Sequence, residues 1–276
     1  MNFTRDIEKK LLEWKDRQGH KPLILRGARQ VGKTSVVNSF GKQFDNYLYA
    51  SLENKDVLSV FDNRKNVEEV LTDLCVVLNV SRKQGSTLLF LDEIQNSSIA
   101  VSQLRYFYEQ LPAIHVIAAG SLLESMLDVH ISFPVGRVEY LAMRPVSFRE
   151  YLSASGLDAM RQRIEQDVTS ANLFHSKLIS EFNRYALIGG MPEIVKNYIE
   201  KHDVISLNRI YNTLLQGYKD DVEKYARNRT MTEVLRFILD SAWTNAGAQL
   251  SFANAGRNTY KSREDGEAFR TLEKAM

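Results

Sequence analysis

The sequence predicts an α/β fold in which a parallel sheet lies between two layers of helices, a three-layer sandwich. Four short, largely apolar runs have the length and composition of buried strands: residues 23–25, 47–52, 87–91 and 115–119. Segments with helical periodicity, such as 67–80 and 99–111, separate these runs. Strands that alternate with helices are typical of a parallel sheet, because two parallel strands need a long crossover connection.

The first elements follow one another closely. Apolar residues at helical spacing predict an amphipathic helix over 5–16, and Pro22 then starts the strand at 23–25. A glycine-rich turn leads from this strand into a helix that closes near Gly41. A last strand is expected near 138–141. Residues 23–41 are therefore predicted to form a strand, a loop and a helix.

The pattern of apolar and polar residues changes after Pro145. Strand-like runs disappear, and the remaining residues read as successive helices that are broken at Gly156, at 189–190 and at 227–229. We therefore expect a domain boundary near Arg144.

Composition excludes several classes of protein. The 276 residues include 36 Lys and Arg against 34 Asp and Glu, so no basic domain indicates a nucleic-acid partner. Cys75 is the only cysteine, which excludes a disulfide within the chain and a thiolate zinc cluster. The five histidines are too far apart for a short-spaced metal motif. No apolar run approaches the roughly 18 residues of a membrane span, so we expect a cytoplasmic protein without a membrane partner.

A phosphate-binding motif follows the first strand. It comprises Gly27, Ala28, Arg29, Gln30, Val31, Gly32, Lys33 and Thr34, a full match to G-x-x-x-x-G-K-[ST], and Ser35 continues the expected nucleotide-binding segment. Glycines permit a tight loop whose backbone N–H groups surround phosphates, and the helix N-terminus adds positive partial charge. Lys33 is expected to reach the outer phosphates, and the Thr34 hydroxyl is expected to ligate Mg²⁺.

Two acids end the strand at 87–91. Asp92 and Glu93 are expected at the carboxyl edge of the sheet, beside the phosphate loop that lies 58 residues upstream (92 minus 34). Asp92 is predicted to hold Mg²⁺ through water, and Glu93 to orient or deprotonate the attacking water. Without the phosphate loop, the same acids would read as the solvated end of a strand.

These acids also favour ATP over GTP. Ras-like GTPases continue the magnesium aspartate as Asp-x-x-Gly, whereas here Gln95 stands three positions after Asp92. The nearest guanine-like triplet, at Asn54 and Lys55, has Val57 where its aspartate should be. A water-activating glutamate favours hydrolysis over phosphoryl transfer to a small molecule.

Ser121 follows the strand at 115–119 and is a candidate sensor that hydrogen-bonds the attacking water or the γ-phosphate. The alternative is that Ser121 caps a helix over 122–127, because Glu124 completes a capping box. The two roles are compatible.

Arg137 follows Gly136 in the loop before the last predicted strand. It is a candidate for neutralising charge on the γ-phosphate, within the chain or across a subunit interface. The alternative is a surface ion pair.

These motifs together resemble a known family. The strings RGARQVGKTS, LLFLDEIQ, AAGSLLE, GRVEYLAMRPVSFREYL, GGMPEIV and YKDDVEKYA are similar to those of poorly characterised bacterial and archaeal AAA-superfamily ATPases with a C-terminal nuclease-like domain of unknown function. The resemblance covers roughly residues 4–276. It implies ATP binding, an additional strand between the two phosphate-site strands, a helical lid and a winged helix. It also implies that Ser121 is the sensor, that Arg137 is the finger candidate, and that the turn at 189–192 is a lid turn near adenine. The alternative is that this turn only joins two helices.

The resemblance divides the chain into an AAA-type core over 1–145, a helical lid over 146–229 and an incomplete winged-helix-like segment over 230–276. The sequence stops before a β-wing and before the nuclease-like domain, so we expect a fragment or a truncated gene product.

We expect a Mg²⁺-dependent ATPase whose hydrolysis of ATP to ADP changes its conformation. The alternatives are a non-hydrolysing ATP/ADP switch and a DNA-binding regulatory module that uses the winged helix. A homo-oligomer, and a DNA or protein partner for the C-terminal segment, are compatible with the sequence.

Overall fold

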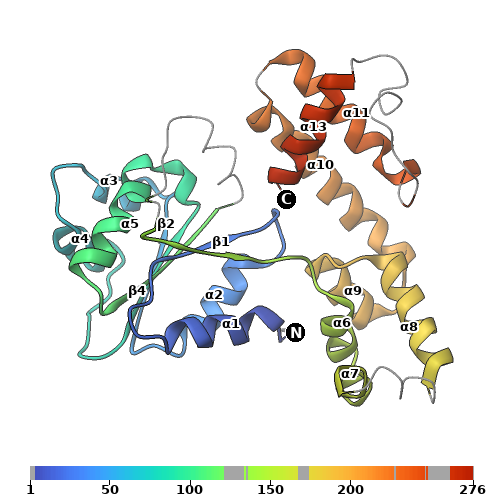
Figure 1. Cartoon of the computed structure of the whole chain (residues 1–276), viewed down its shortest axis with the longest axis horizontal. Coiled ribbons are helices and arrows are strands. Elements are labelled where there is room, and N and C mark those ends of the chain that lie inside the picture. Colours follow the sequence, from blue (N-terminus) through green and yellow to red (C-terminus); the bar gives the residue numbers. More distant parts are fainter. Residues whose placement is uncertain are drawn as a thin grey trace. The chain divides into compact units, whose positions relative to one another are not determined.

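The structure is a computed structural model (Figure 1), which describes residues 4–120, 134, 136–166, 174–226, 228–245, 247 and 262–275. The chain separates into two compact units, Met1–His202 and Asp203–Met276. None of the described helices is long and apolar enough to cross a membrane.

The first unit contains a five-stranded, fully parallel sheet. Its strands are β1 (Leu23–Arg26), β2 (Asn46–Ser51), β3 (Thr87–Asp92), β4 (Ile114–Ala119) and β5 (Glu139–Ala142). Their order is β2-β3-β4-β1-β5, so β4 lies between the strand that precedes the phosphate loop and the strand that ends in Asp92. This confirms the predicted α/β class and the additional strand between the two phosphate-site strands.

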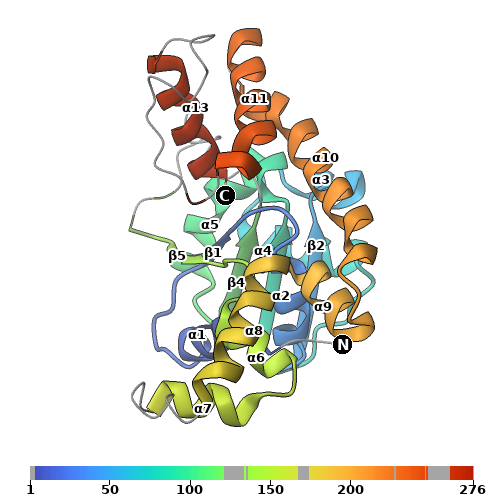
Figure 2. The same cartoon turned by 90° about the vertical axis from the view of Figure 1, so that its right-hand side faces the viewer.

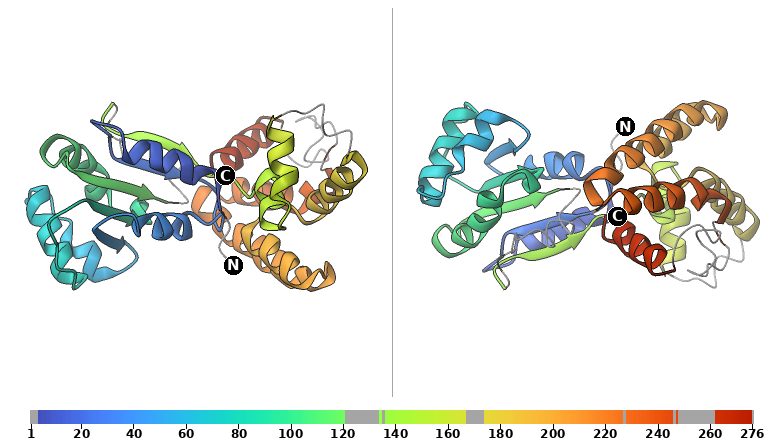
Figure 3. Two further views of the ribbon diagram at one scale, coloured as in Figure 1. Left: turned by 90° about the horizontal axis from the view of Figure 1, so that it is seen from below. Right: turned by 90° about the horizontal axis from the view of Figure 1, so that it is seen from above.

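Alternate residues of the strands face two separate cores, as the period of two in a strand requires. On β3, Leu88 and Phe90 pack with residues of α1 (Asp6–Lys15) and α2 (Lys33–Gly41). Leu89 and Leu91 pack instead with residues of three further helices: α3 (Lys55–Val60), α4 (Val67–Val77) and α5 (Ser98–Gln110). Figure 3 shows the helices on the two faces of the sheet. The three-layer sandwich is therefore present.

Only helices follow β5 among the described residues. In the first unit they are α6 (Phe148–Ala154), α7 (Asp158–Gln166), α8 (His175–Ile188) and α9 (Pro192–Lys201) (Figure 2). The Val146 amide donates to the carbonyl oxygen of Gly190 at 2.7 Å, which joins the start of α6 to the turn before α9. A Cβ at Gly190 would lie 2.4 Å from the Val146 carbonyl oxygen, so only glycine permits this approach.

The second unit is helical in its described residues. It contains η4 (Ile205–Leu207), α10 (Asn208–Tyr225), α11 (Arg229–Asn245) and α13 (Ser262–Ala275). Val222 of α10 shares a small core with Val234 and Leu235 of α11 and with Ala268 of α13. The split between the units after His202 falls inside the expected lid. The winged helix and the division at residues 145 and 229 stay predictions.

An aromatic cluster lies at the amino end of β4. The His20 and His115 rings are stacked, with centroids 3.7 Å apart, and Trp14 packs edge-on against both. Nε2 of His115 donates to the carbonyl oxygen of Lys15 at 3.0 Å. Burial lowers the pKa of His115 to about 4, and the nearby charge of Lys15 acts in the same direction. The folded protein therefore holds His115 in its neutral form.

This cluster predicts acid sensitivity. An unfolded chain binds a proton at His115 near the ordinary pKa of about 6.5, whereas the folded chain does so only near pH 4. The contribution of His115 to the free energy of unfolding is therefore complete above pH 6.5 and is lost as the pH falls towards 4. Between pH 7 and pH 5 we expect the Tm of the wild type to fall by about 2–4 °C more than that of His115→Gln, measured by thermal unfolding. The control is His175→Gln at the exposed start of α8, which should keep the wild-type pH dependence. Parallel curves for wild type and His115→Gln would contradict the prediction.

Candidate functional site

The phosphate loop depends on glycine at both of its ends. Gly27 has φ 154° and Gly32 has φ 93°, values that side chains rarely allow. A Cβ at Gly27 would also lie 2.2 Å from the carbonyl oxygen of Met143, because the chain after β5 runs directly beside β1. The loop therefore fits between β1 and the chain after β5 only without a side chain at this position. Gln30 also has a positive φ of 64°.

Lys33 begins α2 with its ammonium group held against the loop. Its Nζ donates to the carbonyl oxygens of Gly27 at 2.7 Å and Ala28 at 2.9 Å, and the residue is only 8% exposed. Burial lowers the pKa of Lys33, while the negative charges of Glu93 and Asp92 oppose that shift. An ammonium has three donors, so one N–H remains for a phosphate oxygen.

Asp92 receives hydrogen bonds from two sides. The Thr34 hydroxyl donates to Asp92 Oδ2 at 2.8 Å, and the Tyr49 hydroxyl donates to the same oxygen at 3.2 Å. Asp92 is 5% exposed. Burial, and then the negative charge of Asp92, raise the pKa of Tyr49, so the phenol stays protonated and remains a donor.

The hydroxyl of Thr34 and the carboxylate of Asp92 are hard oxygen ligands, which suit Mg²⁺. In the described part of the chain, no group of three or more His, Cys, Asp or Glu side chains is placed to hold a metal. This donor set fits Mg²⁺, because that ion is commonly held by one or two protein oxygens together with substrate phosphates and water.

Glu93 lies directly after β3 in a left-handed conformation, with φ 53° and ψ 45°. Its backbone N–H donates to Asp92 Oδ1 at 3.1 Å. The side-chain amide of Gln95 donates to Glu93 Oε2, while Gln95 Oε1 is buried and has no partner among the described residues. The backbone turn and the amide together fix where the Glu93 carboxylate points.

A cavity of about 570 Å³ joins these groups. One wall comes from the phosphate loop and α2, with Arg29, Gln30, Gly32, Lys33, Thr34, Ser35, Val36 and Ser39. Asp92 and Glu93 at the end of β3, together with Arg5 and Glu8 near the start of the chain, form a second part. Pro192, Glu193 and Lys196 of α9 complete the lining. Ala28 and Val31 instead pack their side chains into the core below the loop. The cavity therefore brings together the expected acidic residues and most of the expected phosphate-site residues, whereas Gly27, Ala28 and Val31 do not line it.

Several residues in and beside the cavity belong to no recognisable motif. Arg5 and Glu8 carry no local signal for a ligand, and Gln95 stands out in the sequence only as a departure from a GTPase pattern. Tyr49 carries no local signal either, because its place beside Asp92 follows from the pairing of β2 with β3, which sets Ser51, two residues after Tyr49, opposite Asp92. Pro192 lines the cavity, and the role of its turn as a lid near adenine stays a prediction.

The structure does not place the sensor candidate Ser121, and it places the finger candidate Arg137 away from this cavity. Ser121 lies outside the described residues, which reach Ala119 at the end of β4 and Gly120. Arg137 lies just before β5 begins, whereas the phosphate loop follows the end of its parallel neighbour β1. Arg137 is therefore at the opposite edge of the sheet, where its side chain is 44% exposed and pairs with Glu109 at 2.8 Å. Within one copy of the chain it does not reach the phosphates.

Comparisons with known proteins agree with this geometry over part of the chain. Residues 19–152 match a family described as an AAA domain, and residues 179–276 match a family described as a domain of unknown function, DUF8612. No curated protein sequence matches the chain.

Solved structures resemble the chain only distantly. The Pif1 helicase from Candida albicans is 12% identical over 58% of this chain and 44% of its own, with a TM-score of 0.35. The STAND protein with a tetratricopeptide-repeat sensor from Pyrococcus horikoshii is 13% identical over 98% and 45%, with a TM-score of 0.45. The ORC2 protein of Aeropyrum pernix is 12% identical over 99% and 86%, with a TM-score of 0.47. The chain thus spans less than half of the first two proteins, and scores at this level assign no activity or partner.

The shared hydrogen bond to Asp92 gives a test of the site. Tyr49→Phe removes one donor from the carboxylate, so Asp92 is less firmly oriented, and groups that orient ligands typically change metal affinity by about 10–100-fold. We expect the Mg²⁺ concentration for half-maximal nucleotide binding to rise about tenfold, measured by titration with a fluorescent nucleotide. Tyr47→Phe is the matched control, because the Tyr47 hydroxyl donates to Asn38 and not to Asp92. Equal Mg²⁺ dependence in the two variants would count against the assigned role of Tyr49.

Proposed function

We propose that the protein hydrolyses ATP to ADP and phosphate in a Mg²⁺-dependent reaction, and the match of residues 19–152 to a family described as an AAA domain supports this proposal. We further propose that the nucleotide state changes the conformation of the segment α6–α9. The observation that carries the proposal is the direct hydrogen bond between Thr34 and Asp92, at the mouth of the loop that holds Lys33.

The loop and α2 bind the triphosphate in this proposal. Backbone N–H groups of the loop and the positive end of the α2 dipole attract the phosphate oxygens. Lys33 adds a full positive charge in a buried position, where an electrostatic interaction is stronger than in water. When bound between Thr34, Asp92 and the phosphates, Mg²⁺ would supply further neutralisation of their charge.

Glu93 is the proposed base. Its carboxylate accepts a proton from the attacking water as the water oxygen bonds to the γ-phosphorus, and the bond to the bridging oxygen of ADP breaks. The Gln95 amide holds one oxygen of that carboxylate, which leaves the other oxygen for the water. Lys33 neutralises charge that develops on the oxygen of the departing ADP.

Nucleotide binding and turnover are separable by two substitutions. Lys33→Ala removes the buried cation, and we expect it to lose most ATP binding. Glu93→Gln keeps the shape of the side chain but removes the base, so we expect ATP affinity near that of the wild type and turnover at least about 10²-fold slower. The measurements are steady-state ATP hydrolysis with Mg²⁺ and the affinity of each variant for ATP and GTP.

Lys42→Ala is the control, because Lys42 caps the other end of α2 and is exposed. Unchanged ATP binding in Lys33→Ala would show that the nucleotide lies elsewhere. Tight ATP binding without turnover in the wild type would favour the non-hydrolysing switch instead.

Arg137 is proposed to act only between copies of the chain. Its place at the opposite edge of the sheet excludes action on the nucleotide of its own copy, while its exposure suits an interface. Under conditions of assembly, we expect Arg137→Ala to lower kcat by on the order of 10³-fold. Arg105→Ala is the matched control, because Arg105 pairs with the same Glu109 oxygen at 2.9 Å. Full turnover by Arg137→Ala in every assembly state, measured across protein concentrations, would remove Arg137 from the mechanism.

A further inference from the structure

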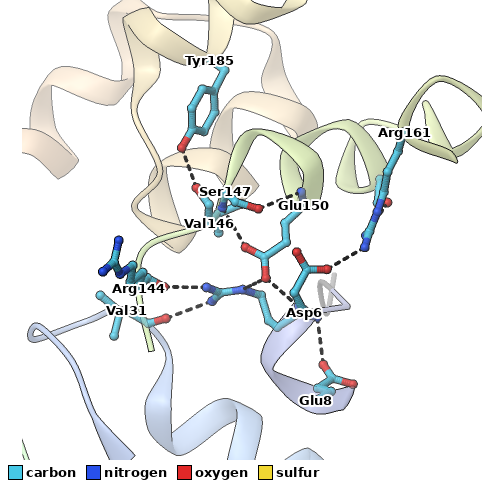
Figure 4. Close-up of polar contacts among 11 residues, drawn as sticks. Asp6, Glu8, Val31, Arg144, Val146, Ser147, Glu150, Arg161 and Tyr185 are labelled. Atoms are coloured by element: carbon cyan, nitrogen blue, oxygen red, sulfur yellow. Dashed lines mark hydrogen bonds and ion pairs between the residues drawn. The ribbon is translucent and has the colours of Figure 1, made fainter. Parts of the chain in front are cut away.

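Arg5, which precedes α1, joins three segments that are distant in sequence. Its Nη1 donates to the carbonyl oxygen of Val31 at 3.1 Å, Nη2 to that of Arg144 at 2.7 Å, and Nε to Glu150 Oε1 at 3.0 Å. In Figure 4, dashed lines mark these three contacts of the guanidinium with the labelled residues Val31, Arg144 and Glu150. Arg5 is 6% exposed and Glu150 is 4% exposed, so the ion pair is buried. One guanidinium thus connects the phosphate loop, the segment just after β5 that contains Arg144, and α6.

The Glu150 carboxylate has further partners. Its Oε1 also accepts from the Asp6 amide at 2.7 Å, and its Oε2 accepts from the Ser147 amide at 2.7 Å (Figure 4). Glu150 is the third residue of α6 and forms a capping box with Ser147. The orientation of Arg5 is therefore tied to the first turn of α6.

The contact with Val31 bears on phosphate binding. The Val31 C=O and the Gly32 N–H belong to one planar trans peptide, so they point in opposite directions. A donor that holds the Val31 oxygen on one side therefore directs the Gly32 N–H to the other side. Both Gly32 and Arg5 line the cavity, and Gly32 is the last residue before α2. Arg5 thereby orients a backbone donor of the phosphate loop.

The same network continues towards α9. The Val146 carbonyl, one position before Ser147, accepts from the Tyr185 hydroxyl of α8 at 2.8 Å. The Val146 amide donates to Gly190, in the turn that places Pro192 at the cavity. A shift of Arg5 at the loop is thus connected through hydrogen bonds to the opposite wall of the same cavity.

We propose that Arg5 is a positioning residue that couples nucleotide phosphate binding at the loop to α6 and the turn before α9. It holds the Gly32 N–H in its binding orientation, and through Glu150 it links occupancy of the loop to the conformation of the first turn of α6. This inference rests on the proposed function, because it names the contact through which nucleotide state reaches the segment α6–α9.

The first experiment uses a variant that avoids an unpaired buried charge. Arg5→Met/Glu150→Gln removes both charges, and the carboxamide oxygen introduced by Glu150→Gln would still accept from one of the two amides that bind the native carboxylate. We expect the double variant to bind ADP about tenfold more weakly than the wild type, because the phosphate loop loses the donor to Val31. Arg5→Lys keeps the positive charge but has a single donor nitrogen in place of the guanidinium fork, so it should recover only part of the loss. The measurement is ADP affinity by calorimetry, with KM and kcat for ATP.

Arg161→Gln is the matched control. Arg161 of α7 ties down the same N-terminal segment through Asp6 at 2.6 Å, and it makes no contact with the phosphate loop. We expect its ADP affinity to stay within about twofold of the wild type. If Arg5→Met/Glu150→Gln lowers the Tm of the apo protein but binds ADP as tightly as the wild type, then Arg5 is only a structural brace and the inference is overturned.

The second experiment needs no substitution. Hydrogen exchange of the wild type with saturating ADP should slow at the loop amides and also at the amides of Asp6, Ser147 and Val146, which donate to Glu150 or to Gly190. The amides of α4, on the other side of the sheet, should be unchanged. Protection confined to the loop would overturn the coupling while leaving the proposed function intact. Absence of ADP binding would overturn the proposed function and the inference together.

Discussion

The site depends on the parallel pairing of β1, β4 and β3. All three strands run in the same direction, so the loop after β1 and Asp92 at the end of β3 emerge at one edge of the sheet. The Thr34 hydroxyl then reaches Asp92 across the end of β4 at 2.8 Å. An antiparallel β3 would place Asp92 at the far edge, roughly 20 Å away by the length of a six-residue strand. Sheet direction therefore decides whether the residues of the proposed magnesium and phosphate site can meet at all.

Burial gives this edge its electrostatic character. Lys33 is desolvated, which lowers its pKa, and the carboxylates of Asp92 and Glu93 favour its charged form. Asp92 keeps two hydrogen-bond donors directed at one oxygen. The charges are thus held in place before any ligand arrives, so little reorganisation is needed when phosphates bind.

Local motifs in the sequence predict the parts of the site whose chemistry is contiguous in the chain. The loop over 27–34 and the acids after the run at 87–91 are such motifs, and short apolar runs locate most of the strands. Tyr49 and Gln95 are not predictable in this way, because their roles arise from strand pairing and from a left-handed turn at Glu93. Arg5 is even harder to predict, because its partner Glu150 lies 145 positions away in the sequence. A charged side chain is also normally expected to be exposed to solvent.

The Arg5 and Glu150 pair is poorly explained by stability alone. Removing two charges from water costs several kcal/mol per ion, and well-packed apolar residues of similar volume are often as stable as a buried ion pair. Here each charged group has several hydrogen-bond partners, which offsets the desolvation without producing a clear gain. What apolar side chains cannot do is hold the Val31 carbonyl and the first turn of α6 in one fixed arrangement. The pair is therefore better understood as a geometric link between the phosphate loop and α6 than as a source of folding energy.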